Sequence, residues 1–562
     1  MKIIIGIGHH SEVVYSILLS CENMENVKFV SYLARKTLEE LPEPIKSHYL
    51  GELEDVCEGD HQFVIGFGDN KARKEIARKY PQLKYMNAIH PSAIISPNVQ
   101  IGVGNVICAG VIIQTSTVIG DHNIINTNAS VDHHNRIANY CHVAPNCGLC
   151  GDVQLYDGVF VGVGSSIVPR MNVKPWAFIK ANSLVKASTA PIQMYEPSID
   201  QYKTSALEAI NSGWISSLGK YVPLATQKLK EVLGAQHVIL TNNGTTATHC
   251  LFLALRYCYP NIGKIYVPNN VYVAAWNCAL MEYDETQLEV MKIDSSTWNM
   301  CVDEDYLRSL DANSAVLVVH NVGNIINIPR LKRIRPDLIF VEDNCEGFSG
   351  QYEGHYTGTS DATLCTSISF FGNKTITTGE GGAVVVSDRD LFDYLHKTCH
   401  QGMTTRRYLH DVLGYNYRMT NVQAAFLYDQ LCDFQRIVET KNNLFNTYEK
   451  LLGDLIEKGS VKLQRLESGT QRAHWMFTLR IINNLPYENL QKYMNSQGIE
   501  VRPMFYPIEK HTHLANIKRC ADDLPELIQR ECVMLPSSPS LTYDEQEYII
   551  DNLRKYIEMN HI

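Results

Sequence analysis

The sequence contains no apolar run that approaches the length needed to span a bilayer. Its first residues, MKIIIGIGHHSEVV, hold an apolar run that is too short for a secretory signal and is interrupted by glycine and histidine. They are more typical of a first strand and the turn that follows it. We therefore expect a cytoplasmic protein that does not contact a membrane.

Basic residues are also fewer than acidic ones. The sequence has 50 Lys and Arg and 60 Asp and Glu, which gives a net charge of -10. This balance argues against nucleic acid as a partner. It still allows a nucleotide, because helix N-termini bind phosphate through backbone N–H groups. The 16 cysteines are scattered without a paired framework, which indicates reduced thiols. One CxxC, Cys147 to Cys150, has no second pair, so we expect no metal site.

The chain has 562 residues, of which 45% are hydrophobic and 20% charged, so it predicts a globular protein of several domains. Within residues 1–88, KIIIGIG and HQFVIGFG predict buried strands that end in glycine turns. SEVVYSILLSC and DNKARKEIARKY predict the helices between and after them. This alternation predicts a small α/β unit whose ligand lies beyond the carboxyl ends of the strands.

From residue 89 the pattern changes, because every sixth residue is aliphatic without a break. Neither a helix nor a simple strand has a period of six, whereas a parallel β-helix does, with one short strand on each side of a coil. The aliphatic side chains are expected to point inward, and Gly, Asn and Asp between them suit tight corners. We assign residues 89–188 to this β-helix. The series is Ile89, Ile95, Ile101, Ile107, Ile113, Ile119, Ile125, Val131, Ile137, Val143, Leu149, Leu155, Val161, Ile167, Val173, Ile179 and Val185.

The segment KASTAPIQMYEPS marks the exit from this region. Beyond it, HVILTNN, KIYVPNN, AVLVVHN, LIFVED and GGAVVVSD alternate with helical stretches, as in a large α/β fold. The sequence therefore predicts a large domain over residues 192–463. Residues 464–562 are expected to form a smaller α/β subdomain.

Three groups of residues in the C-terminal half point to one chemistry. Gly244, Thr245 and Thr246 follow a strand and open a helix, which offers N–H groups and hydroxyls to a phosphate. Asp343 ends a buried strand, where a carboxylate must be paired. Lys374 precedes a glycine-rich turn, and a partly desolvated lysine is a nucleophile toward an aldehyde. Each group alone has an ordinary structural explanation, but in this order they are what a pyridoxal-phosphate (PLP) transaminase requires, with Asp343 on the pyridinium nitrogen.

With these motifs in place, residues 192–562 closely resemble the sugar-nucleotide aminotransferases of the DegT/DnrJ/EryC1/StrS family, of the perosamine-synthase and bacillosamine-pathway type. The resemblance implies the fold of aspartate aminotransferase and a covalent bond between Lys374 and the cofactor. It further implies that Thr245, Thr246 and Ser369 hold the cofactor phosphate and that Tyr272 stacks on its ring. Asn416 would reach the cofactor of the neighbouring subunit. Residues implied near the sugar nucleotide are Trp214, His410, Tyr417 and Arg502. The matching segments are SGWISSLGKYV, NGTTATH, EDNCEG, SFFGNKTITTGEGG, YLHDVLGYNYRMTN, HWMFTLRI and VRPMFYP.

Two positions depart from the family pattern. Glu346, a further implied cofactor contact, stands where the family often has Gln, and HNVGN at 320–324 differs from the usual His-x-x-Gly segment. Lys374 argues against the dehydratase branch, in which His replaces the lysine. The implied reaction moves an amine from glutamate to carbon 4 of a nucleotide-linked 4-keto-6-deoxyhexose, with Lys374 as general acid and base. UDP is the expected nucleotide, and GDP and dTDP stay open.

The β-helix carries its own candidate residues in VDHHNRIANYCHV, where Asp132, His133, His134 and His142 stand close together. Histidine accepts a proton from an amine near neutral pH, although a single histidine here is more often a coil corner. Residues 1–188 resemble the bacillosamine-pathway type of sugar N-acetyltransferase, a nucleotide-binding unit followed by a left-handed β-helix that trimerises. The resemblance makes His133 the catalytic base and places His142 near the thioester of acetyl-CoA. Gly151 would lie against acetyl-CoA.

This half also departs from its family. His134 replaces the usual acid, and we expect Asp132 to orient His133 instead. Gly6, Gly8 and His10 are expected to bind the sugar nucleotide, although GIGHH differs from the usual Gly-x-x-Gly-His. The acidic pair that would bind the base is missing from FVSYLARK at 29–36, which leaves the nucleotide open.

Together the halves predict a bifunctional enzyme that makes a nucleotide-linked 4-acetamido-4,6-dideoxyhexose for a glycan. One alternative is an aminotransferase whose inactive β-helix only trimerises and binds sugar nucleotide. A second is a non-catalytic PLP- or nucleotide-binding sensor. The implied dimeric and trimeric families predict a homo-oligomer, and a hexamer satisfies both symmetries. The sequence leaves open the group at carbon 2, the stereochemistry of the amine and any channelling.

Overall fold

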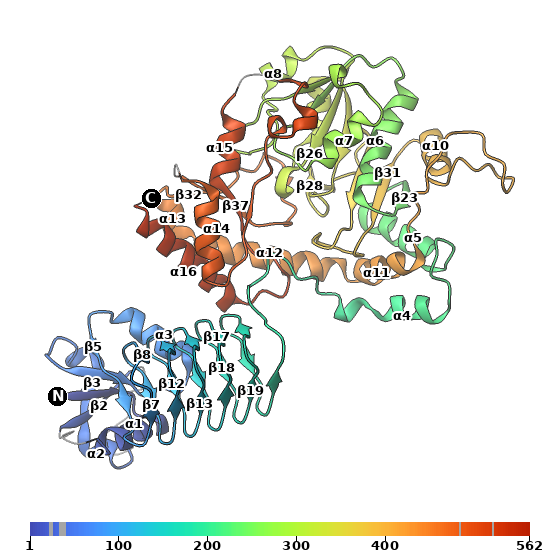
Figure 1. Ribbon diagram of the computed structural model, residues 1–562. Helices are drawn as coiled ribbons and strands as arrows, with labels where there is room; N and C mark the ends of the chain where they lie inside the picture. Colours follow the sequence, from blue (N-terminus) through green and yellow to red (C-terminus); the bar gives the residue numbers. More distant parts are fainter. Residues whose placement is uncertain (22–25, 33–40, 483–484, 520–521, 562) are drawn as a thin grey trace. The chain divides into compact units, whose positions relative to one another are not determined.

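The computed structural model describes residues 1–21, 26–32, 41–482, 485–519 and 522–561. The last part of FVSYLARK therefore lies outside the described residues. The chain divides into two compact units. The first is Met1–Ile192 with Asn495–Ile499, and the second is Gln193–Met494 with Glu500–Ile562 (Figure 1).

The first unit begins with the expected parallel sheet, in the strand order β3-β2-β1-β4-β5. Gly6, after β1, has φ +132, and a Cβ there would lie 2.7 Å from Ser11 Oγ, so only glycine fits this turn into α1. The strands are β1 (Lys2–Ile5), β2 (Val27–Ser31), β3 (Tyr49–Glu52), β4 (Gln62–Ile65) and β5 (Lys84–Tyr85). The helices are α1 (His9–Leu19), α2 (Ile45–His48) and α3 (Asn70–Lys79).

Seventeen two-residue strands follow, from β6 (Ala88–Ile89) to β22 (Leu184–Val185). They form three parallel sheets in which each strand pairs with the third strand after it, as Ile112 pairs with Ser130. This is the pairing that a parallel β-helix with 18 residues per coil requires. Each aliphatic residue of the six-residue series is the second residue of its strand, and the series from Ile107 to Val173 is buried. The handedness of the coil stays a prediction.

The backbone at the corners of the coils explains why Gly, Asn and Asp recur between the aliphatic residues. Every sixth residue from 104 to 182 has a left-handed backbone, where residues without a Cβ or with a short polar side chain are favoured. His134 occupies one of these corners, with φ 59. The full set is Gly104, Gly110, Ser116, His122, Asn128, His134, Tyr140, Asn146, Asp152, Gly158, Gly164, Arg170, Trp176 and Asn182.

Arg73 of α3 joins the small sheet to the β-helix inside this unit. Its side chain is 1% exposed and donates to the carbonyls of His122, Tyr140 and Cys141. The guanidinium also donates to the carbonyls of Phe67 and Gly68 and to Asn70 Oδ1. Burial lowers the pKa of Arg73 to about 10. A buried cation is tolerable here because its N–H groups all find oxygen acceptors.

The second unit is built on an eight-stranded sheet, in the order β23-β31-β30-β27-β26-β24-β25-β36, with only β31 antiparallel to its neighbours. Hydrophobic cores cover both faces, one against α6, α7 and α10 and the other against α4, α5 and α11. The strands are β23 (His237–Thr241), β24 (Ile265–Val267), β25 (Leu288–Val290), β26 (Ala315–Val319), β27 (Ile339–Asp343), β30 (Thr363–Ser369) and β31 (Gly382–Val386). The helices are α4 (Thr204–Asn211), α5 (Tyr221–Leu233), α6 (Gly244–Cys258), α7 (Ala274–Leu280), α8 (Glu304–Ser309), α9 (Ile328–Ile334), α10 (Arg389–Cys399) and α11 (Asn421–Cys432).

The long helix α12 (Phe434–Leu451) leads to a second sheet, in the order β32-β34-β37-β35. β36 (Lys518–Arg519), from the same part of the chain, instead adds the edge strand to the large sheet.

Among the described residues, no helix is both long and apolar enough to cross a membrane. The remaining elements are β32 (Val461–Lys462), β34 (Thr478–Ile481), β35 (Arg502–Pro503), β37 (Cys532–Met534), α13 (Gly453–Glu457), α14 (Tyr487–Ser496), α15 (Leu524–Glu531) and α16 (Tyr543–Met559), with a three-stranded sheet of β28 (Gln351–Tyr352), β29 (His355–Tyr356) and β33 (Thr470–Gln471).

Candidate functional site

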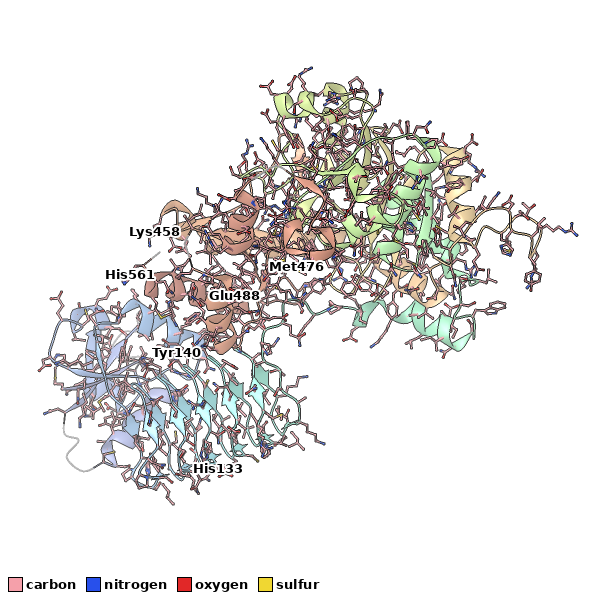
Figure 2. All side chains as sticks on the ribbon, turned by 45° about the horizontal axis from the view of Figure 1, so that its top comes forward. His133, Tyr140, Lys458, Met476, Glu488 and His561 are labelled. Carbon is pink, nitrogen blue, oxygen red and sulfur yellow. The ribbon has the colours of Figure 1, made fainter. Side chains whose placement is uncertain are left out.

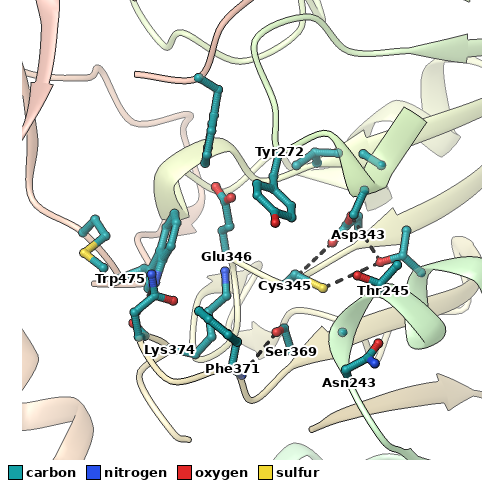
Figure 3. Close-up of a pocket in the computed structure, with 18 of the residues that line it drawn as sticks. Asn243, Thr245, Tyr272, Asp343, Cys345, Glu346, Ser369, Phe371, Lys374 and Trp475 are labelled. Carbon is teal, nitrogen blue, oxygen red and sulfur yellow. Dashed lines mark hydrogen bonds between the residues drawn. The ribbon is translucent and has the colours of Figure 1, made fainter. Parts of the chain in front are cut away.

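A cavity of about 520 Å³ lies where β27 and β30 end and α6 begins. Lys374 and Trp475 lie together at one side of it, and Asp343 and Thr245 lie at the other (Figure 3). The sequence motifs, which are up to 130 residues apart, therefore meet in one place. The predicted residues that line the cavity are Gly244, Thr245, Tyr272, Asp343, Glu346, Ser369, Lys374 and Arg502.

The beginning of α6 forms a wall of this cavity that suits an anion. The first N–H groups of a helix have no partner within the helix and carry its positive dipole end. Asn243 caps the helix by accepting from the Thr246 N–H at 2.9 Å. At Gly244 a Cβ would lie 2.6 Å from Cβ and Oγ of Ser369, so the glycine lets the helix approach β30 closely. The approach brings the Ser369 hydroxyl and Thr245 to the same wall.

Thr246 is used differently from the expectation. Its hydroxyl donates to Asn242 Oδ1 at 2.8 Å and lies near the carbonyl of Asn243 at 2.9 Å. Thr246 is also absent from the residues that line the cavity. Its hydroxyl therefore stabilises the turn before α6, because the strand-to-helix turn leaves carbonyl groups that need donors.

Asp343 is the last residue of β27 and is 6% exposed. Its Oδ1 accepts from the Cys345 N–H at 3.0 Å, and its Oδ2 lies 3.4 Å from the Thr248 hydroxyl. Neither partner is charged. A buried carboxylate that faces a cavity with only neutral partners suits a cationic group of a ligand, such as a protonated ring nitrogen.

Lys374 is fixed from both sides of its loop. Its Nζ lies 3.9 Å from the centroid of the Trp475 ring. The Trp475 indole N–H donates to the Asn373 carbonyl at 3.0 Å, and the Tyr195 hydroxyl donates to the Lys374 carbonyl at 2.9 Å. The backbone is thus held while the amine faces the cavity. Sequence reasoning missed Trp475 and Tyr195, although Trp475 stands in the HWMFTLRI segment that carried the resemblance.

Glu346 is 5% exposed and lies in the wall near Lys374 (Figure 3). Burial raises the pKa of its carboxyl to about 7, against the opposing effects of Lys374 and of a hydrogen bond from the Val322 N–H. That bond is 2.7 Å long. Val322 has φ 49 and ψ 32, a conformation that strains a β-branched residue. The departure at HNVGN is thus a strained loop that points an N–H group at Glu346.

Four other predicted residues lie outside the cavity of this chain. Asn416 and His410 are exposed, and Trp214 is 61% exposed. His410 bonds the Gln401 carbonyl through Nδ1, and the Tyr417 hydroxyl lies 2.9 Å from His249 Nδ1 at the edge of the core. The Tyr417 carbonyl accepts from the Asn242 N–H at 2.8 Å, just before α6, but none of the four side chains lines the cavity.

The cavity fits PLP by the chemistry of its walls. A helix N-terminus with Thr245 and Ser369 suits a phosphate, and the buried Asp343 suits a pyridinium nitrogen. Lys374 supplies the amine that an aldehyde requires. Tyr272, which is 59% exposed and lies 6.1 Å from the Phe505 ring by centroids, provides an aromatic face in the same wall.

On the β-helix, His133 is exposed and follows strand β13 (Ser130–Val131) (Figure 2). Its ring lies against Gly151 of the next coil, where a Cβ would be 2.5 Å from Cε1. The Nδ1 atoms of His133 and His134 are 3.0 Å apart. Asp132 does not take the orienting role that we expected, because its carboxylate accepts from the His133 backbone N–H at 2.8 Å, as the corner requires. The partner of the His133 ring is His134.

His142 lies in β15 (His142–Val143), on a different sheet from His133, and is 9% exposed. It accepts from Asn126 through Nε2 and donates to the Gly68 carbonyl through Nδ1. Burial, Arg73 and His10 lower its pKa to about 4. Burial and Arg73 lower the pKa of His10 to about 4 as well. Gly8 caps α1 beside His10, so the structure groups His142 with the predicted nucleotide residues of the small sheet.

Comparison with known proteins agrees with this two-part organisation. Residues 198–554 match the DegT/DnrJ/EryC1/StrS aminotransferase family, and residues 3–80 match the PglD N-terminal domain. The GDP-perosamine synthase of Escherichia coli O157:H7 is 31% identical over 370 residues, which cover 65% of this chain and 98% of that protein. The GDP-perosamine synthase of Vibrio cholerae is 30% identical and is covered to 99%, again with 65% of this chain.

Solved structures share the fold of the second unit. An E. coli GDP-4-keto-6-deoxy-D-mannose-3-dehydratase with bound hydrated PLP has a TM-score of 0.59 at 19% identity, covering 65% of this chain and 99% of that one. Helicobacter pylori PseC, an aminotransferase involved in the biosynthesis of pseudoaminic acid, has a TM-score of 0.58 at 20% identity, with 65% and 99% covered. The cavity walls, the match over residues 198–554 and the shared fold lead to one conclusion: the chain belongs to the DegT/DnrJ/EryC1/StrS aminotransferase family.

Proposed function

We propose that the second unit transfers an amine from glutamate to carbon 4 of a nucleotide-linked 4-keto-6-deoxyhexose. The observation that carries this proposal is the opposed placement of Lys374 and Asp343 across one cavity, with the beginning of α6 in its wall. Bound PLP supplies an aldehyde for amine exchange and a ring that accepts electrons from the reacting carbon. We propose GDP before UDP as the nucleotide, because the two relatives described above are named GDP-perosamine synthases.

The residues that line the cavity have different roles in this proposal. Asp343 would hold positive charge on the ring nitrogen, and Thr245, Ser369 and the α6 N-terminus would hold the phosphate. The amine of Lys374 gives and takes the proton at the reacting carbon. Arg502, at the rim and paired with Glu500 at 3.1 Å, is placed to meet an anionic part of the substrate.

We propose further that the first unit acetylates the new amine with acetyl-CoA, so that the chain carries out two consecutive steps. The support is the match to the PglD N-terminal domain together with the exposed His133, whose ring rests on Gly151. His133 removes a proton from the attacking amine through Nε2. The alternative stays an aminotransferase with an inactive β-helix.

The predicted residues that lie outside the cavity support an oligomer. We propose that a partner chain brings Asn416, Trp214, His410 and Tyr417 to the site, so the dimer completes it. Mixing a Lys374→Arg variant with an Asn416→Ala variant then restores part of the activity, because mixed dimers contain one intact site. Lack of recovery after verified subunit exchange contradicts the shared site. A trimeric β-helix would extend the dimer to a hexamer.

The function is tested with GDP-, UDP- and dTDP-linked 4-keto-6-deoxyhexoses, glutamate and then acetyl-CoA, with products followed by mass spectrometry. We expect replacement of the keto oxygen by an amine, then gain of one acetyl group. Lys374→Arg removes the first step and leaves acetylation of supplied amino sugar intact, while His133→Ala does the reverse. No thiol release above background supports the inactive β-helix. An unchanged absorbance of bound PLP on adding glutamate supports a non-catalytic sensor.

A further inference from the structure

Lys441, in the middle of α12, is a lysine whose side chain is almost wholly buried. It is 1% exposed, and burial is the sole cause acting on its pKa, which falls to about 7. Among the described residues the amine therefore has no charged partner. A buried amine of this kind is costly unless its N–H groups are satisfied. Nothing in the proposed chemistry assigns it a role.

The Lys441 amine lies 5.9 Å from the centroid of the Phe445 ring on its own helix and also contacts three other segments. It donates to the carbonyl of Trp475 at 2.9 Å and to the carbonyl of Ser537 at 2.5 Å. It also lies 5.3 Å from the centroid of the Tyr195 ring. The amine thus ties α12 to the segments before β34, after β37 and before α4.

Two of these contacts continue to neighbouring carbonyl groups of the catalytic loop. Trp475 donates through its indole N–H to Asn373, and Tyr195 donates through its hydroxyl to Lys374. The Trp475 ring also lies 3.9 Å from Lys374 Nζ. One residue therefore links Lys441 to the Lys374 loop on each of two routes, Trp475 on the first and Tyr195 on the second.

We propose that Lys441 is a positioning residue that sets the place and the proton affinity of the Lys374 amine through Trp475 and Tyr195. The inference rests on the role proposed for Lys374 and adds to it a residue outside the cavity. Its physical basis is that a lysine amine has enough N–H groups to hold two carbonyl oxygens in a fixed relation. Lys441 holds the backbone carbonyl of Trp475, while the indole N–H bond to the Asn373 carbonyl holds the ring.

A purely structural role makes a different prediction. If Lys441 only joins α12 to its neighbours, its loss lowers stability and leaves Lys374 unchanged once the protein is folded. If it positions Lys374, its loss changes the pH at which the Lys374 amine titrates. Stability and titration are measured separately, so the two roles are distinguishable.

The test compares Lys441→Met with Lys332→Met in the full-length protein. Lys332 is a matched control because its amine also donates to two carbonyls, of Pro336 at 2.9 Å and Leu338 at 2.8 Å, and does not line the cavity. For Lys441→Met we expect the pH midpoint of the visible absorbance of bound PLP to move by about one unit. We also expect kcat/KM for amination to fall about 10- to 100-fold. Lys332→Met keeps both values.

A second readout needs no cofactor. Limited labelling of lysines in the apoprotein at several pH values, read by mass spectrometry, reports the titration of Lys374 itself. The Lys441→Met midpoint should differ from that of the wild type, while other labelled lysines keep theirs. The inference is overturned if both midpoints equal those of Lys332→Met. Absence of any PLP absorbance in the wild type contradicts the proposed function instead.

Tyr195→Phe keeps the proposal testable if Lys441→Met does not fold. The variant removes the hydroxyl that donates to the Lys374 carbonyl and leaves the ring beneath Lys441. We expect the same direction of shift as for Lys441→Met, with a smaller size, because the Trp475 route remains. In the double variant the effects should be less than additive, since both act on Lys374. An unchanged midpoint in Tyr195→Phe contradicts that route and with it the proposal.

Discussion

The imidazole of His133 rests on the backbone of Gly151, one coil further along the β-helix. A Cβ at residue 151 would lie 2.5 Å from Cε1 and 2.6 Å from Nε2 of that ring. The backbone at Gly151 is not left-handed, so the glycine is required by the ring above it and not by its own conformation. The two residues form one local structure, although they are 18 positions apart.

Replacing Gly151 with Ala should therefore displace His133 and remove acetylation while leaving amination unchanged. We expect acetyl transfer to fall about 100-fold, as a misplacement of about 1 Å does. Gly148→Ala is the matched control, because a Cβ there meets Ser130 and Ser166 Oγ at ordinary distances of 3.7 and 3.8 Å. Thiol release from acetyl-CoA with supplied amino sugar measures the effect. Equal rates of acetyl transfer in the two variants would show that the position of the His133 ring does not affect the reaction.

His134 should act as the acceptor that orients the His133 ring. If His133 donates from Nδ1, its Nε2 is free to accept a proton, and a carboxylate at position 134 can accept the same bond. We expect His134→Glu to retain acetylation and His134→Ala to lose about 10- to 100-fold. The pH–rate profile should also change in the alanine variant. An alanine variant with the wild-type rate and profile rules out this orienting role.

Glu346 should make the stability of the aminotransferase unit depend on pH. Its folded pKa of about 7 lies above the ordinary 4.5, so the folded form binds the proton more tightly than the unfolded form. The stabilisation is fully present below pH 4.5 and is lost as the pH rises through 7, by up to about 3 kcal/mol. Glu346→Gln should remove this slope.

Urea unfolding of the apoprotein between pH 5 and pH 8 measures the slope. Tryptophan fluorescence reports mainly on this unit, since Trp176 is the one of the 5 tryptophans that lies outside it. Glu231→Gln, at an exposed position, serves as the control. A slope in Glu346→Gln as steep as in the wild type and the control refutes the assignment.

Gly323 and Gly354 offer a matched pair, because both have φ +83. Alanine at Gly354, which has open space around it, should cost about 1 kcal/mol for the left-handed backbone alone. Alanine at Gly323 should cost clearly more, because its Cβ would lie 2.0 Å from the Ala473 carbonyl. Urea midpoints of the two variants measure the difference. Equal midpoints would show that the loop at Val322 shifts to make room for the added Cβ at little cost in stability.

The six-residue period predicted the strands of the β-helix and their inward residues, because each coil repeats the same local geometry and the signal accumulates over the series. The cavity also brings together three residues that the sequence motifs singled out. Gly244 begins α6, Asp343 ends β27 and Lys374 lies in the loop after β30.

Other features depend on contacts that the sequence pattern does not encode. The Thr246 hydroxyl was expected at the phosphate and serves the turn instead, because Asn242 lies within its reach. Trp475 and Lys441 come from segments far along the chain, and tertiary packing brings Trp475 to Lys374 and Lys441 to the Trp475 carbonyl. Asn416 and Tyr417 carry family motifs, yet a single chain holds them away from its own cavity.

The spacing of strands in the β-helix also restricts how this half of the protein can change its length. An insertion or deletion of 18 residues adds or removes one whole coil, and every outward side chain keeps its sheet. Within the repeat, a length that is not a multiple of 18 changes the register of the strands that follow. Because His133 and Gly151 are one such step apart, no whole coil can be gained or lost between them without separating ring from glycine. Whole coils can therefore be added only before His133 or after Gly151.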